Sequence, residues 1–150
     1  EVTRIDTWVK EAIKGGATLV CGGHKIGESC YAATILLNPP KDAKVSTKEV
    51  FGPVVCIYSY ENVEDAFNAA NSLEVSFQAA IFTKNLDMAL HAVRRLNGTA
   101  VMVNDHTAFR VDWMPFGGAK ASGLGLGGIP YSMEEMSKEK MMVIKSKSLQ

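Results

Sequence analysis

The chain has 150 residues, of which 16 are basic and 16 acidic, so its formal net charge at pH 7 is zero. This balance argues against nucleic-acid binding, which usually needs a basic excess, and the length suits one domain with a sizeable core. No apolar run reaches the roughly 18 residues of a membrane span, and the first ten residues lack a signal peptide's apolar region. The chain has only three cysteines, and an odd number cannot all pair within one chain, so a disulfide framework is not expected. We therefore expect a reducing, cytoplasmic location.

The first third of the chain predicts one helix followed by two strands. Apolar residues recur at helical spacing on one face, at Ile5, Trp8, Val9, Ala12 and Ile13. Gly15 and Gly16 follow, where a left-handed helix end is expected. Short apolar runs predict strands over 18–21 and 31–37, and the sequence Asn-Pro-Pro at 38–40 ends the second strand.

The middle of the chain alternates strands with helices. Apolar runs predict strands over 54–60, 79–83 and 99–103. Two amphipathic helices are predicted between these strands, the first capped by Asn62 and the second by Asn85. This order implies parallel strand pairing with right-handed crossovers. We therefore predict an α/β fold with a mostly parallel sheet and flanking helices.

Residues 104–129 show neither helical nor strand periodicity and are rich in glycine. The segment follows the end of a predicted parallel strand, where open α/β sheets place their sites. Residues 123–128 match G-x-G-x-x-G, but no long helix follows, which argues against a dinucleotide fingerprint. The chain closes with a predicted short helix over 131–136 and a predicted strand over 141–145 that could pair with another chain.

None of the three cysteines has the surroundings of a nucleophile. Cys56 lies in the apolar run Val-Val-Cys-Ile-Tyr, where burial raises the thiol pKa and suppresses the thiolate. Cys21 precedes His24 by three residues, a common spacing, and Cys30 has no evident partner. We therefore expect no catalytic cysteine among these residues.

The histidines at 24, 91 and 106 lack the spacing of metal ligands, so we expect no metal site. His106 is the best site candidate among them because it follows Asp105 at a strand end. A solvated loop pair is an equal alternative. Glu49 precedes Phe-Gly-Pro and a buried strand, where its carboxylate could accept hydrogen bonds from a polyol or amide. From composition alone, a solvated turn acid is the simpler interpretation of Glu49.

Two spaced motifs carry a resemblance to a known family. Residues 48–55, KEVFGPVV, resemble the E-x-F-G-P-V signature of the aldehyde dehydrogenase superfamily. Residues 114–123, MPFGGAKASG, resemble its P-F-G-G-x-K-x-S-G signature, and Asn104 matches the asparagine after the preceding strand. The opening segment VKEAIKGGATLVCGG resembles the helix–strand unit before the first signature, so the resemblance spans essentially the whole chain.

The resemblance implies the C-terminal part of a catalytic domain over 1–137 and a terminal oligomerisation strand within 138–150. The family's nucleophilic cysteine lies in a G-Q-x-C motif and its general-base glutamate in an E-L-G-G motif. Neither motif occurs in these 150 residues, and the cofactor-binding Rossmann domain is also missing. We therefore expect a fragment, consistent with its lack of an initiator Met, that has no catalytic residue and is inactive alone.

The resemblance also implies roles for individual residues. Glu49 resembles the acid that hydrogen-bonds the nicotinamide ribose of NAD or NADP, and Phe51 the aromatic beside the nicotinamide ring. Such contacts position a cofactor without reacting themselves. Phe116 lies where the family lines its substrate tunnel. Five further residues resemble structural parts of the loop under that tunnel: Gly117, Gly118, Lys120, Ser122 and Gly123.

Arg110 is the substrate clue, because it lies just before the tunnel signature. A guanidinium there could hold a carboxylate, phosphate or sulfonate through two parallel hydrogen bonds. A local ion pair with Asp112 is the alternative. Leu126-Gly127 stands where the family often has Gly-Arg-Glu, and residues 122–136 look closer to a branch that acts on small, often acidic aldehydes.

The intact protein is thus expected to oxidise an aldehyde to an acid as a homo-oligomer, dimer or tetramer, joined through residues 141–145. Two alternatives stay open. One is a non-catalytic assembly or binding module that uses the same terminal strand. The other is a superfamily relative that reduces acyl phosphates or acyl thioesters on the same fold.

Overall fold

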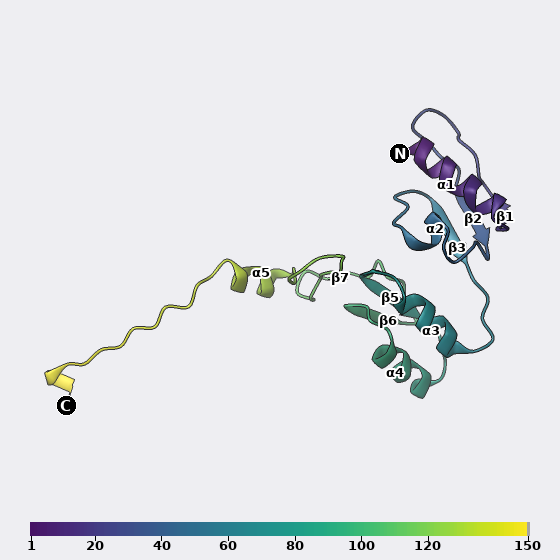
Figure 1. Cartoon of the computed structure of the whole chain (residues 1–150). Helices are drawn as coiled ribbons and strands as arrows, with labels where there is room; N and C mark the ends of the chain where they lie inside the picture. Colours follow the sequence, from purple (N-terminus) through teal and green to yellow (C-terminus); the bar gives the residue numbers. More distant parts are fainter. Residues whose placement is uncertain (150) are drawn as a thin grey trace. The chain divides into compact units, whose positions relative to one another are not determined.

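A computed structural model describes residues 1–149 of the chain. They form two compact units, Glu1–Ala66 and the residues from Phe67 onward, shown in sequence colours in Figure 1. No helix in the described part of the chain is both long and apolar enough to cross a membrane. The domain boundary expected near residue 137 stays a prediction.

The first unit packs two helices against a three-stranded sheet. In chain order its elements are α1 (Val2–Lys14), β1 (Thr18–Cys21), β2 (Thr34–Leu37), α2 (Lys44–Thr47) and β3 (Val54–Ile57). The strand order is β1-β2-β3, with β1 antiparallel and β3 parallel to the central strand. The buried cluster joins the apolar face of α1 to Leu36 of β2 and Val45 of α2, so both helices share one core with the sheet.

The α1 helix ends at the predicted glycines. Gly16 has a φ of +109°, which a residue with a side chain rarely adopts. Its N–H donates to the Ile13 carbonyl and the Ala17 N–H donates to the Ala12 carbonyl, both at 3.0 Å. These two bonds form a Schellman motif, with buried Ala17 and Ala12 supplying its apolar contact.

The second unit contains two small sheets. Its elements are α3 (Val63–Asn71, which begins in the first unit), β4 (Val75–Ser76), β5 (Gln78–Ile81), α4 (Leu86–Arg95), β6 (Ala100–Val103), β7 (Ala119–Lys120), α5 (Ile129–Glu135) and a 3-10 turn over Lys147–Leu149. β5 and β6 run parallel, connected by α4, whereas β4 and β7 pair antiparallel. The predicted caps are present: Asn62 Oδ1 accepts from the Glu64 N–H and Asn85 Oδ1 from the Met88 N–H, both at 3.0 Å.

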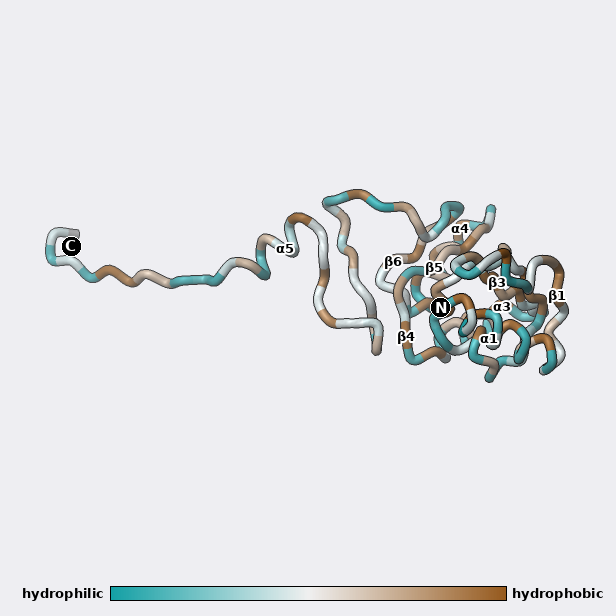
Figure 2. Tube along the Cα trace, turned by 90° about the horizontal axis from the view of Figure 1, so that it is seen from above, coloured by the Kyte–Doolittle hydropathy of each residue, from teal (hydrophilic) through white to brown (hydrophobic). Residues whose placement is uncertain are grey.

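The α/β class is confirmed, with two differences in detail. The parallel pairs β2–β3 and β5–β6 belong to separate sheets, and each sheet is short, so pairing is mixed rather than mostly parallel. Residues 141–145, predicted as a strand, have no regular secondary structure. Figure 2 shows the apolar part of this tail in brown. A strand needs a neighbouring strand for its hydrogen bonds, and the tail has none among the described residues. Its pairing with a second copy stays a prediction.

Candidate functional site

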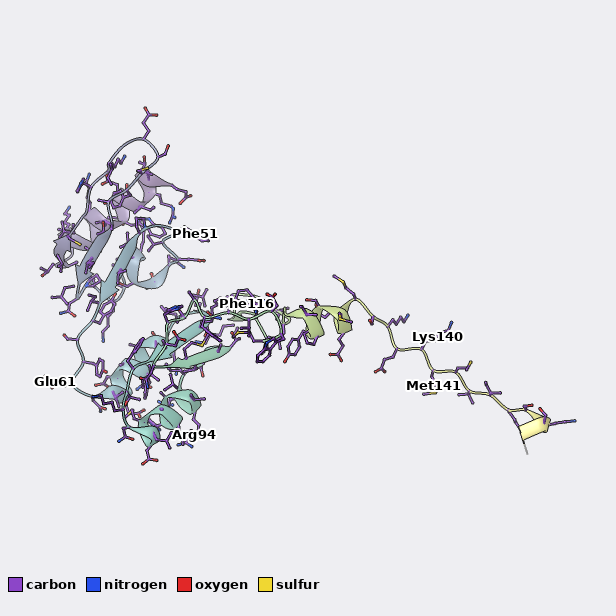
Figure 3. The ribbon with its side chains drawn as sticks, turned by 180° about the vertical axis from the view of Figure 1, so that it is seen from behind. Phe51, Glu61, Arg94, Phe116, Lys140 and Met141 are labelled. Atoms are coloured by element: carbon purple, nitrogen blue, oxygen red, sulfur yellow. The ribbon has the colours of Figure 1, made fainter. Side chains whose placement is uncertain are left out.

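The loop 49–53 of the first unit presents an acid and an aromatic ring on one cavity. Glu49 and Phe51 line a cavity of about 580 Å³ together with Arg4 of α1 and Glu1, the residue before that helix. The Phe51 side chain is 74% exposed and its backbone lies in the left-handed region, at φ +51° (Figure 3). An exposed ring beside a carboxylate can pack on a flat heterocycle while the carboxylate accepts hydrogen bonds from hydroxyl groups.

A backbone hydrogen bond holds the exit of this loop. The Pro53 carbonyl accepts from the Thr34 N–H at 2.8 Å, which ties the loop's exit to the start of β2. Thr34 is fully buried, and its hydroxyl accepts from the Gly23 N–H and donates to the Ala32 carbonyl, both at 2.8 Å. The predicted pair Glu49 and Phe51 therefore projects from a fixed edge of the first sheet.

In the second unit, Arg110 lies over the ring of Phe116. The Arg110 guanidinium carbon is 4.3 Å from the centre of the Phe116 ring, and Nη1 donates to the Met114 carbonyl at 3.3 Å. The Phe116 ring in turn meets Phe77 edge-on, with ring centres 4.9 Å apart. Among the described residues, no ion pair joins Arg110 to Asp112, the local partner considered from the sequence. The guanidinium thus keeps most of its N–H donors for a ligand.

His106 lies apart from this stack. Its Nδ1 accepts from the Ala108 N–H at 3.1 Å, and its Nε2 is 3.9 Å from an Asp105 carboxylate oxygen. In the described part of the chain, no contact joins His106 to Arg110 or to Phe116. The His106 ring therefore makes contacts within its own turn, Asp105–Phe109. A substrate role for this side chain stays a prediction.

The glycine-rich segment after Phe116 is an ordered clasp rather than an open loop. The Lys120 ammonium donates to the carbonyls of Asn71 and Leu73, at 2.6 and 2.8 Å, at the end of α3. Ser122 Oγ accepts from the Ser76 N–H at 3.0 Å. We call residues 117–122 the clasp, because they fasten the segment behind Phe116 to the end of α3 and to β4.

Two glycines make this close approach possible. A Cβ at Gly117 would lie 2.6 Å from the Gly125 carbonyl oxygen, and a Cβ at Gly118 would lie 2.6 Å from Ser122 Cβ. Side chains at these positions would push the clasp apart. Gly117 and Gly118 therefore support the position of Phe116 by allowing close packing of the backbone.

Sequence reasoning missed two residues that complete these sites. Arg4 lines the Glu49 cavity, and Phe77 supports the Phe116 ring. Arg4 lies outside both motifs and joins the loop only through a contact across 46 residues. Phe77 lies just before β5 and has no pattern that separates it from other strand-flanking aromatics. Only the fold brings these residues to their partners.

The structure thus defines an α/β protein with an acid–aromatic cavity in one unit and an arginine–aromatic stack in the other. The family model described as aldehyde dehydrogenase family matches residues 1–142. The chain belongs to the aldehyde dehydrogenase family.

Individual relatives support this assignment. The chain is 41% identical over 144 residues to 3-sulfolactaldehyde dehydrogenase of Priestia megaterium, a match that covers 96% of this chain and 30% of the relative. The structure of aldehyde dehydrogenase 21 from Physcomitrella patens, in complex with the reaction product succinate, superposes with a TM-score of 0.86 at 36% identity and covers 90% of this chain and 28% of the other.

A third relative was solved with a cofactor. The glyceraldehyde-3-phosphate dehydrogenase GapN of Methanocaldococcus jannaschii, complexed with NADP, superposes with a TM-score of 0.86 at 37% identity. That match covers 91% of this chain and 29% of the other. The chain therefore spans about 30% of the length of the relatives that it matches.

Proposed function

We propose that the native protein oxidises an aldehyde to a carboxylic acid with NAD or NADP, and that this chain contributes cofactor and substrate contacts. The observation that carries the proposal is the family match over residues 1–142, with the expected acid and aromatic on one cavity. Bound there, the nicotinamide would accept a hydride from the substrate. The G-Q-x-C and E-L-G-G motifs do not occur in the 150 residues, so this chain's side chains position groups rather than react.

The cavity residues fit a nicotinamide nucleotide. A carboxylate such as Glu49 accepts hydrogen bonds from two neighbouring ribose hydroxyls. The exposed Phe51 ring offers a flat apolar surface for an aromatic heterocycle. Neither residue discriminates NAD from NADP, and either cofactor satisfies both contacts.

We further propose that the substrate is a small aldehyde carrying an anionic group, held by Arg110. The guanidinium carbon lies 4.3 Å from the centre of the Phe116 ring, and the group is free of Asp112 and uses one hydrogen bond to Met114. A stacked guanidinium keeps its in-plane N–H groups available for a carboxylate or sulfonate. One relative is named for 3-sulfolactaldehyde and another was solved with the reaction product succinate, and both compounds carry an anionic group.

The test compares two aldehydes of equal length, succinic semialdehyde and butyraldehyde, in the native protein. A lost charge-assisted bond is worth about 1.5–3 kcal/mol, so Arg110→Ala should raise KM for the anionic aldehyde about 10- to 100-fold. The KM for butyraldehyde should change less than about twofold. Arg94→Ala, which removes an exposed arginine of α4, is the matched control. Equal effects on both aldehydes would refute the anion site, and no cofactor reduction with any aldehyde would refute the oxidation itself.

We also propose that the protein is a cytoplasmic homo-oligomer joined by the tail. Met141, Met142, Val143 and Ile144 are 64–87% exposed, which is unfavourable for apolar side chains in an isolated chain. The three cysteines are free thiols, which suits a reducing compartment. Val143→Pro removes one ladder donor and should shift the mass measured by light scattering toward the monomer. An unchanged mass would favour assembly through another surface.

A non-catalytic assembly module is the second candidate function. The exposed apolar tail favours it. The intact mass of the native protein separates the two functions. A mass near that of its relatives, about three times larger, supports the dehydrogenase, and a mass of 16.2 kDa supports the module. An acyl-phosphate or acyl-thioester reductase would be recognised by a G-Q-x-C motif without the general-base glutamate.

A further inference from the structure

We propose that Arg4 is a positioning residue for the cofactor contacts: by holding the Val50 carbonyl, its guanidinium sets the directions of Glu49 and Phe51. The inference rests on the proposed cofactor role of those two residues. It adds a residue of α1, outside both family motifs, to the machinery of that site.

The central contact is a hydrogen bond between distant parts of the first unit. Arg4 Nη2 donates to the Val50 carbonyl oxygen at 2.7 Å, across 46 residues of sequence. Val50 lies between Glu49 and Phe51, so its carbonyl belongs to the peptide group that leads into Phe51. A bond to this oxygen fixes the plane of that peptide and therefore the starting direction of the Phe51 backbone.

The Phe51 backbone needs such a restraint. Its φ of +51° lies in the left-handed region, which costs an L-residue free energy and is disfavoured in a free loop. The neighbouring residues must therefore hold the loop in this conformation. The Val50 carbonyl, in the peptide group directly before Phe51, accepts a hydrogen bond from the Arg4 side chain.

The guanidinium is itself held on two other sides. It lies over the Trp8 ring, 4.3 Å from the ring centre, one turn further along α1. On the other side it forms an ion pair with Glu1, whose carboxylate accepts from Nε at 2.8 Å. The hydrogen bond from Arg4 lowers the pKa of Glu1, so this carboxylate stays ionised to a lower pH than an ordinary glutamate. A side chain held at three points has little freedom left to release the loop.

The next residue of the helix makes a second contact with the same loop. Ile5 is buried, and a Cβ at Gly52 would lie 2.4 Å from Ile5 Cδ1. Arg4 and Ile5 thus hold Val50 and Gly52, the residues on either side of Phe51. Arg4 of α1 and Glu1, which caps that helix, line the same cavity as Glu49 and Phe51.

A purely structural role for Arg4 makes a different prediction. Loss of a stabilising contact lowers the unfolding midpoint but leaves the kinetic constants of the folded protein alone. Loss of positioning changes the KM for the cofactor in protein that is still folded, while the KM for the aldehyde stays the same. A change in the KM for the cofactor without a change in the KM for the aldehyde therefore distinguishes a positioning role from a purely structural one.

The experiment uses four variants of the native protein, with NAD and NADP each titrated at saturating aldehyde. Arg4→Met keeps the apolar stem beside Trp8 and removes every donor, whereas Arg4→Lys keeps one donor and the charge. Arg94→Met is the control for loss of an exposed arginine. Glu49→Gln tests the proposed cofactor contact itself. Circular dichroism of each variant reports whether it is folded.

We expect Arg4→Met to raise the KM for the cofactor about five- to tenfold, with the KM for the aldehyde unchanged. Arg4→Lys should recover part of this loss, and Arg94→Met should match the parent. A cofactor KM within twofold of the parent for folded Arg4→Met, together with a raised KM for Glu49→Gln, overturns the positioning role alone. An unchanged KM for Glu49→Gln overturns the proposed cofactor contact. If Arg4→Met does not fold, Arg4→Leu, which also removes every donor, is judged by the same twofold criterion.

Discussion

Asn38 and Asn104 make the same contact at the ends of two different parallel strand pairs. Asn38 follows β2, and its N–H donates to the Ile57 carbonyl at the end of β3. Its Oδ1 accepts from the Ser59 N–H at 3.2 Å, two residues further on. Its backbone is left-handed, with a φ of +47°.

The second unit repeats this arrangement. Asn104 follows β6 with a φ of +59°, and its N–H donates to the Ile81 carbonyl at the end of β5. Its amide both accepts from the Thr83 N–H at 2.8 Å and donates to the Thr83 carbonyl at 2.9 Å. Each asparagine thus ends one strand and extends the pairing by two residues with its side chain. At Asn104 the chain then turns into the segment that carries Arg110.

Substitutions at Asn104 should separate the conformational effect from the hydrogen bonds. Asn104→Ala loses both amide bonds and places alanine at a positive φ, so we expect the free energy of unfolding to fall by about 2–3 kcal/mol. Asn104→Gly loses the same bonds without strain and should cost about 1 kcal/mol less. Urea unfolding of both variants measures the difference. A glycine variant no more stable than the alanine variant would contradict the left-handed requirement.

The contact between Ile5 and Gly52 should be sensitive to a single methyl group. Gly52→Ala would place Cβ 2.4 Å from Ile5 Cδ1, so we expect a loss of about 1–3 kcal/mol. Ile5→Val removes the clashing atom and alone should cost about 0.5–1.5 kcal/mol. The double variant should be more stable than the sum of the two losses predicts. Strict additivity in urea unfolding would show that the methyl group is accommodated elsewhere.

The clasp should depend on the Lys120 ammonium rather than on its apolar stem. Lys120→Met removes the bonds to the Asn71 and Leu73 carbonyls, which we expect to cost about 1–3 kcal/mol. Lys84→Met, at an exposed lysine after β5, should change stability by less than about 0.5 kcal/mol. Thermal unfolding of both variants checks this difference. Similar midpoints would mean that water replaces the ammonium at the end of α3.

The three thiols should react at different rates. Burial raises the pKa of Cys56, whose thiol also donates to the Val45 carbonyl, so less thiolate is present at neutral pH. Cys21 and Cys30 are exposed. We therefore expect iodoacetamide to modify the half-buried Cys56 after the two exposed thiols, with the Cys56 rate rising only at a pH above the ordinary thiol range. Peptide mass spectrometry over a time course measures the order, and early modification of Cys56 would contradict its burial.

The raised pKa also has a consequence for stability. In the unfolded chain the Cys56 thiol ionises at its ordinary pKa, whereas in the fold it keeps its proton to a higher pH. Its contribution is therefore complete below the ordinary thiol pKa and is lost as the pH rises through the raised value.

Local patterns predicted the elements that depend on neighbouring residues. The α1 face, its glycine end and the caps at Asn62 and Asn85 all involve partners within five residues, and each was confirmed. The parallel order of β5 and β6 also followed from the intervening helix, because crossovers leave few alternatives. Short-range physics was sufficient for these features.

Contacts between distant residues could not be predicted in the same way. β4 and β7 have only two residues each and pair across more than 40 positions, so neither shows a strand pattern. The bond from Arg4 to Val50 and the stack of Arg110 on Phe116 depend on where loops return. The motif resemblance indicated Glu49, Phe51 and Phe116 as residues of interest, but not the neighbours that hold them.

The clasp also bears on the order in which the second unit forms. Lys120 and Ser122 join residues 46–49 positions earlier in the chain. A ribosome therefore completes α3 and β4, and β5, α4 and β6 after them, before the clasp residues emerge. Until Lys120 is added, the Asn71 and Leu73 carbonyls lack the bonds from its ammonium. The segment around Phe116 consequently emerges after both strands of the parallel pair β5–β6.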